Sequence, residues 1–143
     1  MLGRPPRGVW RVARRCRCGL PQVIETDPFL EDGTPFPTLY WLTCPALVAE
    51  VSRLESEGGI REVNEMLQSR PDLERALDEA TAEYISARSR RGGLPRDDHP
   101  GGGPGRVKCL HAHLAHHLIT GNNPVGVWIS ARLDWEEPDE SCL

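Results

Sequence analysis

The chain of 143 residues lacks any apolar run of the ~20 residues that a membrane-spanning helix requires. Its first thirty residues also lack the continuous apolar stretch of a secretory signal peptide. We therefore expect a cytoplasmic protein without a membrane partner.

Several catalytic signatures are absent as well. The sequence has no HExxH helix, no Gly-rich phosphate loop and no G-x-S-x-G elbow. It also lacks the CxxC spacing of a zinc ribbon. These absences make an enzyme of the commonest metalloprotease, nucleotide-binding and esterase classes less favoured, and they leave open whether the protein is an enzyme.

The N-terminal end of the chain lacks negatively charged residues, and the C-terminal end lacks positively charged ones. Residues 1–24 hold six arginines and no acidic residue, whereas acidic residues gather after residue 133. The simplest interpretation is a basic arm that pairs with acidic segments or stays solvated, and contact with an anionic ligand or RNA is the alternative. The net charge of −4 makes a nucleic-acid-binding protein the less favoured class.

The chain length suits one domain. We place this domain at residues 1–133, with a mobile Gly/Pro linker at about 91–105 and a disordered acidic tail at 134–143. Short apolar runs at 9–12, 22–24 and 38–43 predict strands, the first two joined by a Cys-Gly-Pro turn.

Helical periodicity begins at Pro45, a residue that favours the first helical position. Further helices are expected from about Ile60, from Pro71 with Ser69 as cap, and from near Arg106 to Gly121, followed by a short element at 125–133. The predicted fold class is α+β, mostly α, with a small N-terminal β element packed on three to five helices.

The cysteines and histidines predict a metal site. On a helix, Cys109, His113 and His116 fall on one narrow stripe and can reach a common ion. One helix rarely supplies four ligands, and Cys18 and Cys44 lie in rigid turn positions that suit the remaining donors. Five cysteines in a cytoplasmic chain indicate metal binding or thiol chemistry more often than disulfides.

Zinc is the favoured ion for this Cys3His set, and its role is expected to be structural. An iron–sulfur cluster or redox protein is one alternative, and a metal-dependent hydrolase with an open zinc position is another. A metal-free interaction module, with buried cysteines and hydrogen-bonded histidines, also stays open.

Other polar residues lie close to the predicted ligands in the sequence. They either line a pocket and support the ligands, or serve as turn and cap residues. These candidates are His111, His117, Thr26, Asp32, Thr38 and Tyr40.

Three long runs resemble the bacterial domain-of-unknown-function 501 family. They are CGLPQVIETDPFLEDGTPFPTLYWLTCP (18–45), LVAEVSRLESEGGIRE (47–62) and VKCLHAHLAHHLITGNNPVG (107–126). The resemblance covers about residues 9 to 128, implies a bacterial cytosolic protein and names no activity. It supports the metal hypothesis because three of the five cysteines, and His111, His113 and His116, fall inside these runs. The Gly/Pro segment before Val107 departs from the family pattern.

Overall fold

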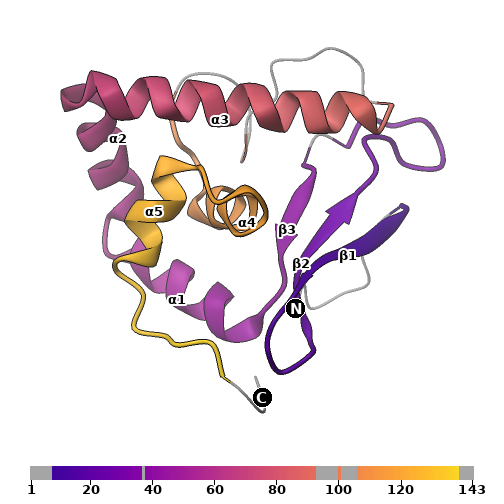
Figure 1. Ribbon diagram of the computed structural model, residues 1–143, viewed down its shortest axis with the longest axis horizontal. Helices are drawn as coiled ribbons and strands as arrows, with labels where there is room; N and C mark the ends of the chain where they lie inside the picture. Colours follow the sequence, from indigo (N-terminus) through magenta and orange to yellow (C-terminus); the bar gives the residue numbers. More distant parts are fainter. Residues whose placement is uncertain (1–7, 37, 93–99, 101–105, 139–143) are drawn as a thin grey trace.

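The computed structural model describes residues 8–36, 38–92, 100 and 106–138, and these residues form three strands and five helices. The elements in chain order are β1 (Trp10–Arg15), β2 (Pro21–Thr26), β3 (Tyr40–Leu42), α1 (Pro45–Ser56), α2 (Gly59–Ser69), α3 (Pro71–Arg90), α4 (Leu110–Thr120) and α5 (Pro124–Ser130). The predicted α+β class is confirmed: a small sheet near the N-terminus packs against a larger helical part (Figure 1).

The sheet is antiparallel, with strand order β1-β2-β3. Gly19 adopts a left-handed conformation with φ +89° in the turn between β1 and β2, which a glycine permits at no steric cost. The central strand β2 is buried from Gln22 to Thr26. The three strands overlap the three apolar runs from which strands were predicted.

Helix α1 follows its sequence signals closely. Pro45 occupies the first helical position, and a stripe formed by Leu47, Val51 and Leu54 is buried. Gly58, left-handed with φ +90°, separates this helix from α2. The helix therefore presents one apolar face inward and leaves its other faces partly exposed.

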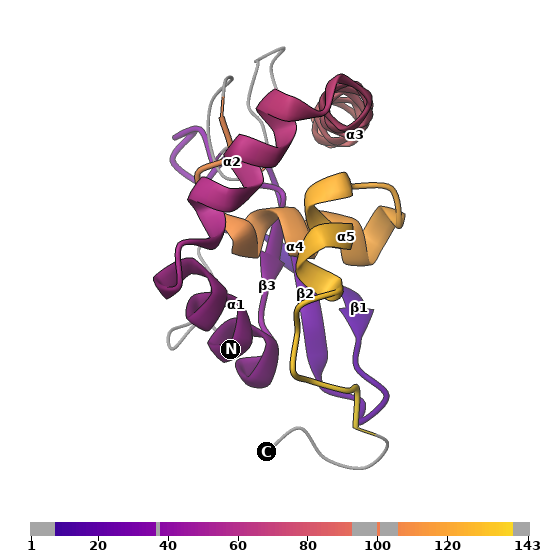
Figure 2. The ribbon, with the colours of Figure 1, turned by 90° about the vertical axis from the view of Figure 1, so that its left-hand side faces the viewer.

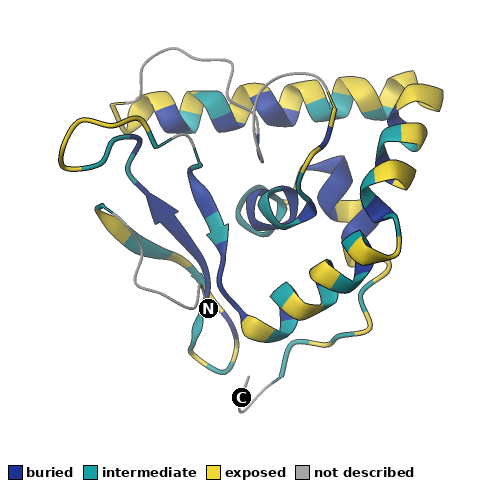
Figure 3. Cartoon of the chain, turned by 180° about the vertical axis from the view of Figure 1, so that it is seen from behind, coloured by how far each residue is buried: buried dark blue, intermediate teal, exposed yellow. Residues whose placement is uncertain are grey.

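Helix α4 is the central helix of the fold. It packs against α5, β3 and α1. Figure 1 shows α4 almost end-on, surrounded by the other elements, and Figure 2 shows it from the side, running across the middle of the molecule. Seen from behind, α4 carries only buried and half-buried residues, whereas the outer face of α3 is exposed along its length (Figure 3). Residues on α4 can therefore contact both the sheet and other helices.

The contact between α4 and α5 depends on a glycine. A Cβ atom built on Gly126 would lie 2.1 Å from Cβ of His117, much closer than two non-bonded carbon atoms approach. Asn123 caps α5 by accepting hydrogen bonds from the backbone N–H groups of Val125 and Gly126. These two residues let α5 fold back tightly onto α4.

Two predicted helix starts need correction. Helix α4 begins at Leu110 rather than near Arg106, because Cys109 is extended, with φ −148° and ψ 118°. The N-cap of α3 is Arg70 rather than Ser69, whose hydroxyl instead donates to the carbonyl of Met66 in α2. Cys109 is thus a residue in front of a helix and not part of its first turn.

The predicted linker at 91–105 lies largely outside the described residues, as do residues 139–143 of the predicted tail. The first part of that tail is docked on the β1–β2 hairpin. Glu137 accepts a hydrogen bond from the backbone N–H of Arg17 and forms ion pairs with the side chains of Arg14 and Arg17. Part of the basic arm therefore pairs with the acidic end of the chain. Over the described ranges, no helix combines the length and apolarity needed to cross a bilayer.

Candidate metal centre

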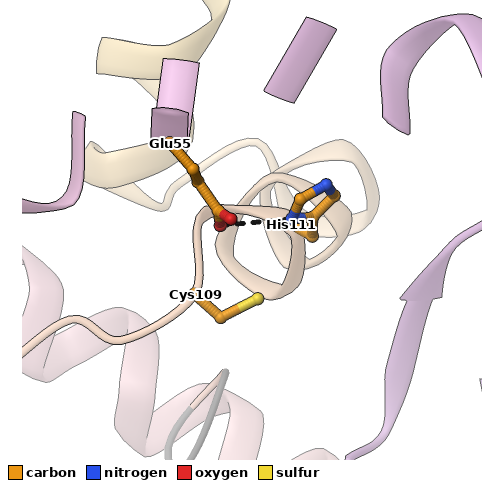
Figure 4. Close-up of side chains that lie close together, drawn as sticks. All are labelled: Glu55, Cys109 and His111. Atoms are coloured by element: carbon orange, nitrogen blue, oxygen red, sulfur yellow. Dashed lines mark hydrogen bonds and ion pairs between the residues drawn. The ribbon is translucent and has the colours of Figure 1, made fainter. Parts of the chain in front are cut away.

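A carboxylate, a thiol and an imidazole meet where α1 passes the start of α4. Glu55, Cys109 and His111 each offer one ligand atom, and these atoms all lie within 4.8 Å of one another (Figure 4). All three residues are half-buried, so each is partly accessible to solvent. Within the described ranges it is the one group of three or more potential ligands close enough to share an ion.

Local structure explains how residues so far apart in sequence converge. Helix α4 lacks a side-chain cap of its own, and the carboxylate of Glu55 takes that place by accepting a hydrogen bond of 2.9 Å from the backbone N–H of Leu110. A negative charge is favourable at a helix N-terminus. The same carboxylate oxygen lies 3.2 Å from Nδ1 of His111.

The other ring nitrogen of His111 is also fixed. Its Nε2 lies 3.3 Å from the carbonyl oxygen of Val48 and 3.1 Å from the hydroxyl of Ser52, both on α1. A proton on Nε2 satisfies the carbonyl and leaves Nδ1 directed at the cluster. Histidines that bind metals commonly donate their second ring N–H to a backbone carbonyl in this way.

The cluster favours charge separation between its thiol and its imidazole. Burial alone would raise the pKa of Cys109, but hydrogen bonds from His111 and from the backbone N–H of Ala112 outweigh it and lower that pKa. The hydrogen bond to Cys109 raises the pKa of His111 to about 8, against the effect of burial and with help from the charge of Glu55. The hydrogen bond between Cys109 and His111 therefore favours the charged form of each residue, and the charge of Glu55 favours the protonated imidazole as well.

The chemistry of this donor set fits a divalent transition metal. A thiolate and a carboxylate supply two negative charges, and a neutral imidazole adds a borderline-soft nitrogen, the combination that zinc accepts. Zinc–ligand bonds of ~2.0–2.3 Å place tetrahedral donors roughly 3.5 Å apart. Donor atoms already within 4.8 Å need side-chain adjustment but no change of fold.

Cys109 is one of five residues that the sequence suggested as metal ligands, and it is the only one of those five in the described cluster. The predicted stripe of Cys109, His113 and His116 is wrong in one respect, because Cys109 precedes the helix that carries the two histidines. His113 and His116 point into the core, with exposed fractions of 3% and 1%. His116 stacks on Tyr40 with ring centroids 6.0 Å apart and meets the edge of Tyr84.

Asn123 joins these two buried histidines. Its Oδ1 is committed to capping α5, so its Nδ2 faces Nδ1 of His113 at 3.1 Å and Nδ1 of His116 at 3.2 Å. Both Nδ1 atoms then accept hydrogen bonds, an arrangement that in a neutral imidazole places the proton on Nε2. Burial lowers the pKa of His116 to about 4. This arrangement is a hydrogen-bonded core network between α4 and α5.

The two remaining predicted ligands lie elsewhere. Cys44 is buried at the start of α1, and a rise of ~1.5 Å per residue puts it roughly 16 Å from Glu55 along that helix. Cys18 lies in the turn between β1 and β2 and is disulfide-bonded, so its sulfur is not a free thiolate. Neither belongs to the cluster around Cys109.

The suggested pocket residues divide in the same way. His111 lies in the cluster, and His117 packs against Gly126. The others make turn, sheet and core contacts: the Thr26 hydroxyl donates to the carbonyl of Thr38, Asp32 accepts from the backbone N–H of Thr34, and the Tyr40 ring stacks on His116. Asp32 is a turn residue, whereas Thr26 is the last residue of β2 and Thr38 is bound through its backbone carbonyl.

Sequence reasoning missed Glu55. It lies on α1 among other charged residues, where glutamate is an ordinary helix-surface residue, and no local pattern marks it. The only sequence signal lay at the start of α4. Cys109 is the residue before this helix and its side chain does not cap it, so the first backbone N–H groups of the helix need an acceptor from another segment.

Comparison with known proteins identifies one family. A family model described as "Protein of unknown function (DUF501)" matches residues 12–131, which is most of the chain. No curated protein and no solved structure matches the chain. The family predicted from the three sequence runs is confirmed, and this protein belongs to the DUF501 family.

Proposed function

We propose that this protein binds one zinc ion through Glu55, Cys109 and His111, with solvent in the fourth coordination position. The observation that carries the proposal is the convergence of a carboxylate, a thiol and an imidazole within 4.8 Å from two separate segments. The contacts of His111 Nε2 with α1 support it, because they hold the ring with Nδ1 turned toward the other two donors.

The donor set argues for zinc over the alternatives. Calcium and magnesium prefer oxygen ligands, and a thiolate suits neither. An iron–sulfur cluster is usually held by four thiolates. The group of potential ligands found among the described residues contains one cysteine, Cys109. Zinc accepts sulfur, nitrogen and oxygen together.

Three protein ligands at a half-exposed position favour a catalytic type of site over the structural role first expected. Structural zinc sites are usually closed by four protein ligands, whereas catalytic sites leave one position for water or substrate. Bound zinc lowers the pKa of such a water to roughly 7, which supplies a hydroxide nucleophile for hydrolysis. The proposed function is therefore metal-dependent hydrolysis at the start of α4.

Elemental analysis of tag-free protein, purified without added metal, tests this proposal. We expect one equivalent of zinc in the wild type, loss of zinc in Cys109→Ser and Glu55→Gln, and retention in Cys44→Ala, which removes a cysteine outside the cluster. Zinc that survives Cys109→Ser, or a folded wild type without metal, contradicts the proposal.

A second candidate function is thiol chemistry at Cys109. It is favoured by the position of the sulfur at the N-terminus of α4, where the backbone N–H of Ala112 and the ring of His111 lower the thiol pKa. In that case metal-free protein should be alkylated at Cys109 faster than at Cys44, and His111→Ala should slow the reaction. Equal alkylation rates at the two cysteines would remove this candidate.

A further inference from the structure

The side chain of Asn64 holds the segment that leads into the candidate metal centre. Asn64 lies inside α2 and is half-buried. Its Oδ1 accepts a hydrogen bond of 2.8 Å from the backbone N–H of Val107, and its Nδ2 donates one of 2.9 Å to the carbonyl oxygen of the same residue. One amide thus pairs with both backbone polar groups of Val107, as a neighbouring β-strand would.

The side-chain amide of Asn64 makes a third hydrogen bond to the backbone. The Nδ2 group also donates to the carbonyl oxygen of Ile60, one turn earlier in α2. Asparagine is a poor residue inside a helix because it competes for backbone hydrogen bonds. Its place in α2 is therefore explained by what it binds and not by helix propensity.

The side chain of Val107 is packed in the hydrophobic core, and its backbone polar groups are bound by Asn64. Residues from Val107 to Cys109 lie outside regular structure, and Val107 has an exposed fraction of 3%, so its backbone groups would be unsatisfied without Asn64. On one side the segment borders a groove of about 810 Å³ lined by residues of α2, α3 and 106–108. Asn64 and Val107 both line this groove, and the side-chain amide of Asn64 binds the backbone of Val107 there.

We propose that Asn64 is a positioning residue for the metal ligand Cys109. This inference rests on the proposed zinc site. Val107 is two residues before Cys109, so a shift of its backbone moves the sulfur relative to Glu55 and His111, which α1 and α4 hold independently. Metal–ligand bond lengths vary by only about 0.2 Å, and loss of a residue that orients a ligand typically lowers metal affinity about 10–100-fold.

The test is a Co²⁺ titration of the full chain, read by the thiolate-to-cobalt charge-transfer absorption, which reports the sulfur bond itself. We expect saturation at one equivalent in the wild type and about 10–100-fold weaker binding in Asn64→Ala. Gln68→Ala is the matched control, because Gln68 lines the same groove from α2 and is exposed. It should bind like the wild type.

The outcomes separate the two proposals. No charge-transfer band in folded wild type overturns the zinc site and this inference with it. A band that Asn64→Ala leaves at full affinity overturns the inference alone. If Asn64→Ala does not fold, Asn64→Asp decides, since it keeps the acceptor for Val107 N–H and loses the donor to Val107 C=O. Undiminished affinity in Asn64→Asp then overturns the role of Asn64.

Discussion

Acidification should destabilise this protein through His116. Its ring is 1% exposed, is stacked on Tyr40 and accepts a hydrogen bond at Nδ1 from Asn123, so a proton added at Nδ1 would face an N–H donor. Burial lowers the pKa of His116 from 6.5 to about 4, with the charge of Glu83 opposing and that of His117 adding to the shift. The folded state therefore binds this proton less readily than the unfolded state.

The sign and size of the effect follow from linkage. Because the folded pKa is depressed, the contribution to stability is fully present above pH 6.5 and is lost as pH falls toward 4. A pKa difference of this size corresponds to a loss of about 2 kcal/mol between pH 7.5 and pH 5, and about 3 kcal/mol by pH 4.

Urea unfolding at a series of pH values measures this loss. Carboxylates also titrate in the lower part of the range, so His116→Phe, which keeps an aromatic ring between the tyrosines, is measured in parallel. The wild type should lose about 2 kcal/mol more than His116→Phe on going from pH 7.5 to 5. Parallel pH dependence in the two proteins would refute the assignment of His116 as a buried neutral ring.

Three further perturbations have expected results. Gly126→Ala places a Cβ against His117 and should lower the free energy of unfolding by at least 1–3 kcal/mol in urea titrations, and unchanged stability would contradict the close α4–α5 contact. Asn123→Ala removes the cap of α5 and the shared donor to His113 and His116, and should cost about 2–4 kcal/mol by the same measurement; a loss below 1 kcal/mol would contradict the network. Removal of bound zinc with a chelator should lower Tm, since a ligand that binds only the folded state stabilises it, and an unchanged Tm would argue against zinc bound to the native state.

Local sequence signals were sufficient for much of the fold. Pro45, the Gly58–Gly59 pair and Gly121 mark helix ends by backbone geometry that the residue type itself favours, and the structure places helix boundaries there. The strands around Gly19 were likewise predictable from the alternation of short apolar runs and a turn.

The candidate metal centre depends on contacts that no local pattern encodes. Helix α4 starts at Leu110 because the amide of Asn64 holds Val107 in non-helical structure and because Glu55 caps the helix from α1. Hydrophobic periodicity predicts a helix that starts near Arg106, because it contains no information about either of these long-range contacts. The sequence could therefore identify Cys109 as a candidate ligand, but it suggested His111 only as a supporting or pocket residue and missed Glu55.

The two histidines of the predicted stripe show a second limit. His113 and His116 share a helix face, as the spacing required, but that face meets Asn123 and the tyrosines of β3 and α3 and not a cluster of ligands. Helical spacing indicates which side chains lie together. It does not indicate whether the surface opposite them supplies a metal ligand or a hydrogen-bond donor.

X-ray absorption at the zinc edge of the purified protein tests the central claim most directly, because it counts the atoms bound to the metal. The Glu55–Cys109–His111 site predicts one sulfur at about 2.3 Å and nitrogen or oxygen ligands at about 2.0–2.2 Å. Two or more sulfurs per zinc would instead require Cys44 or another cysteine at the metal and would contradict the site at the start of α4.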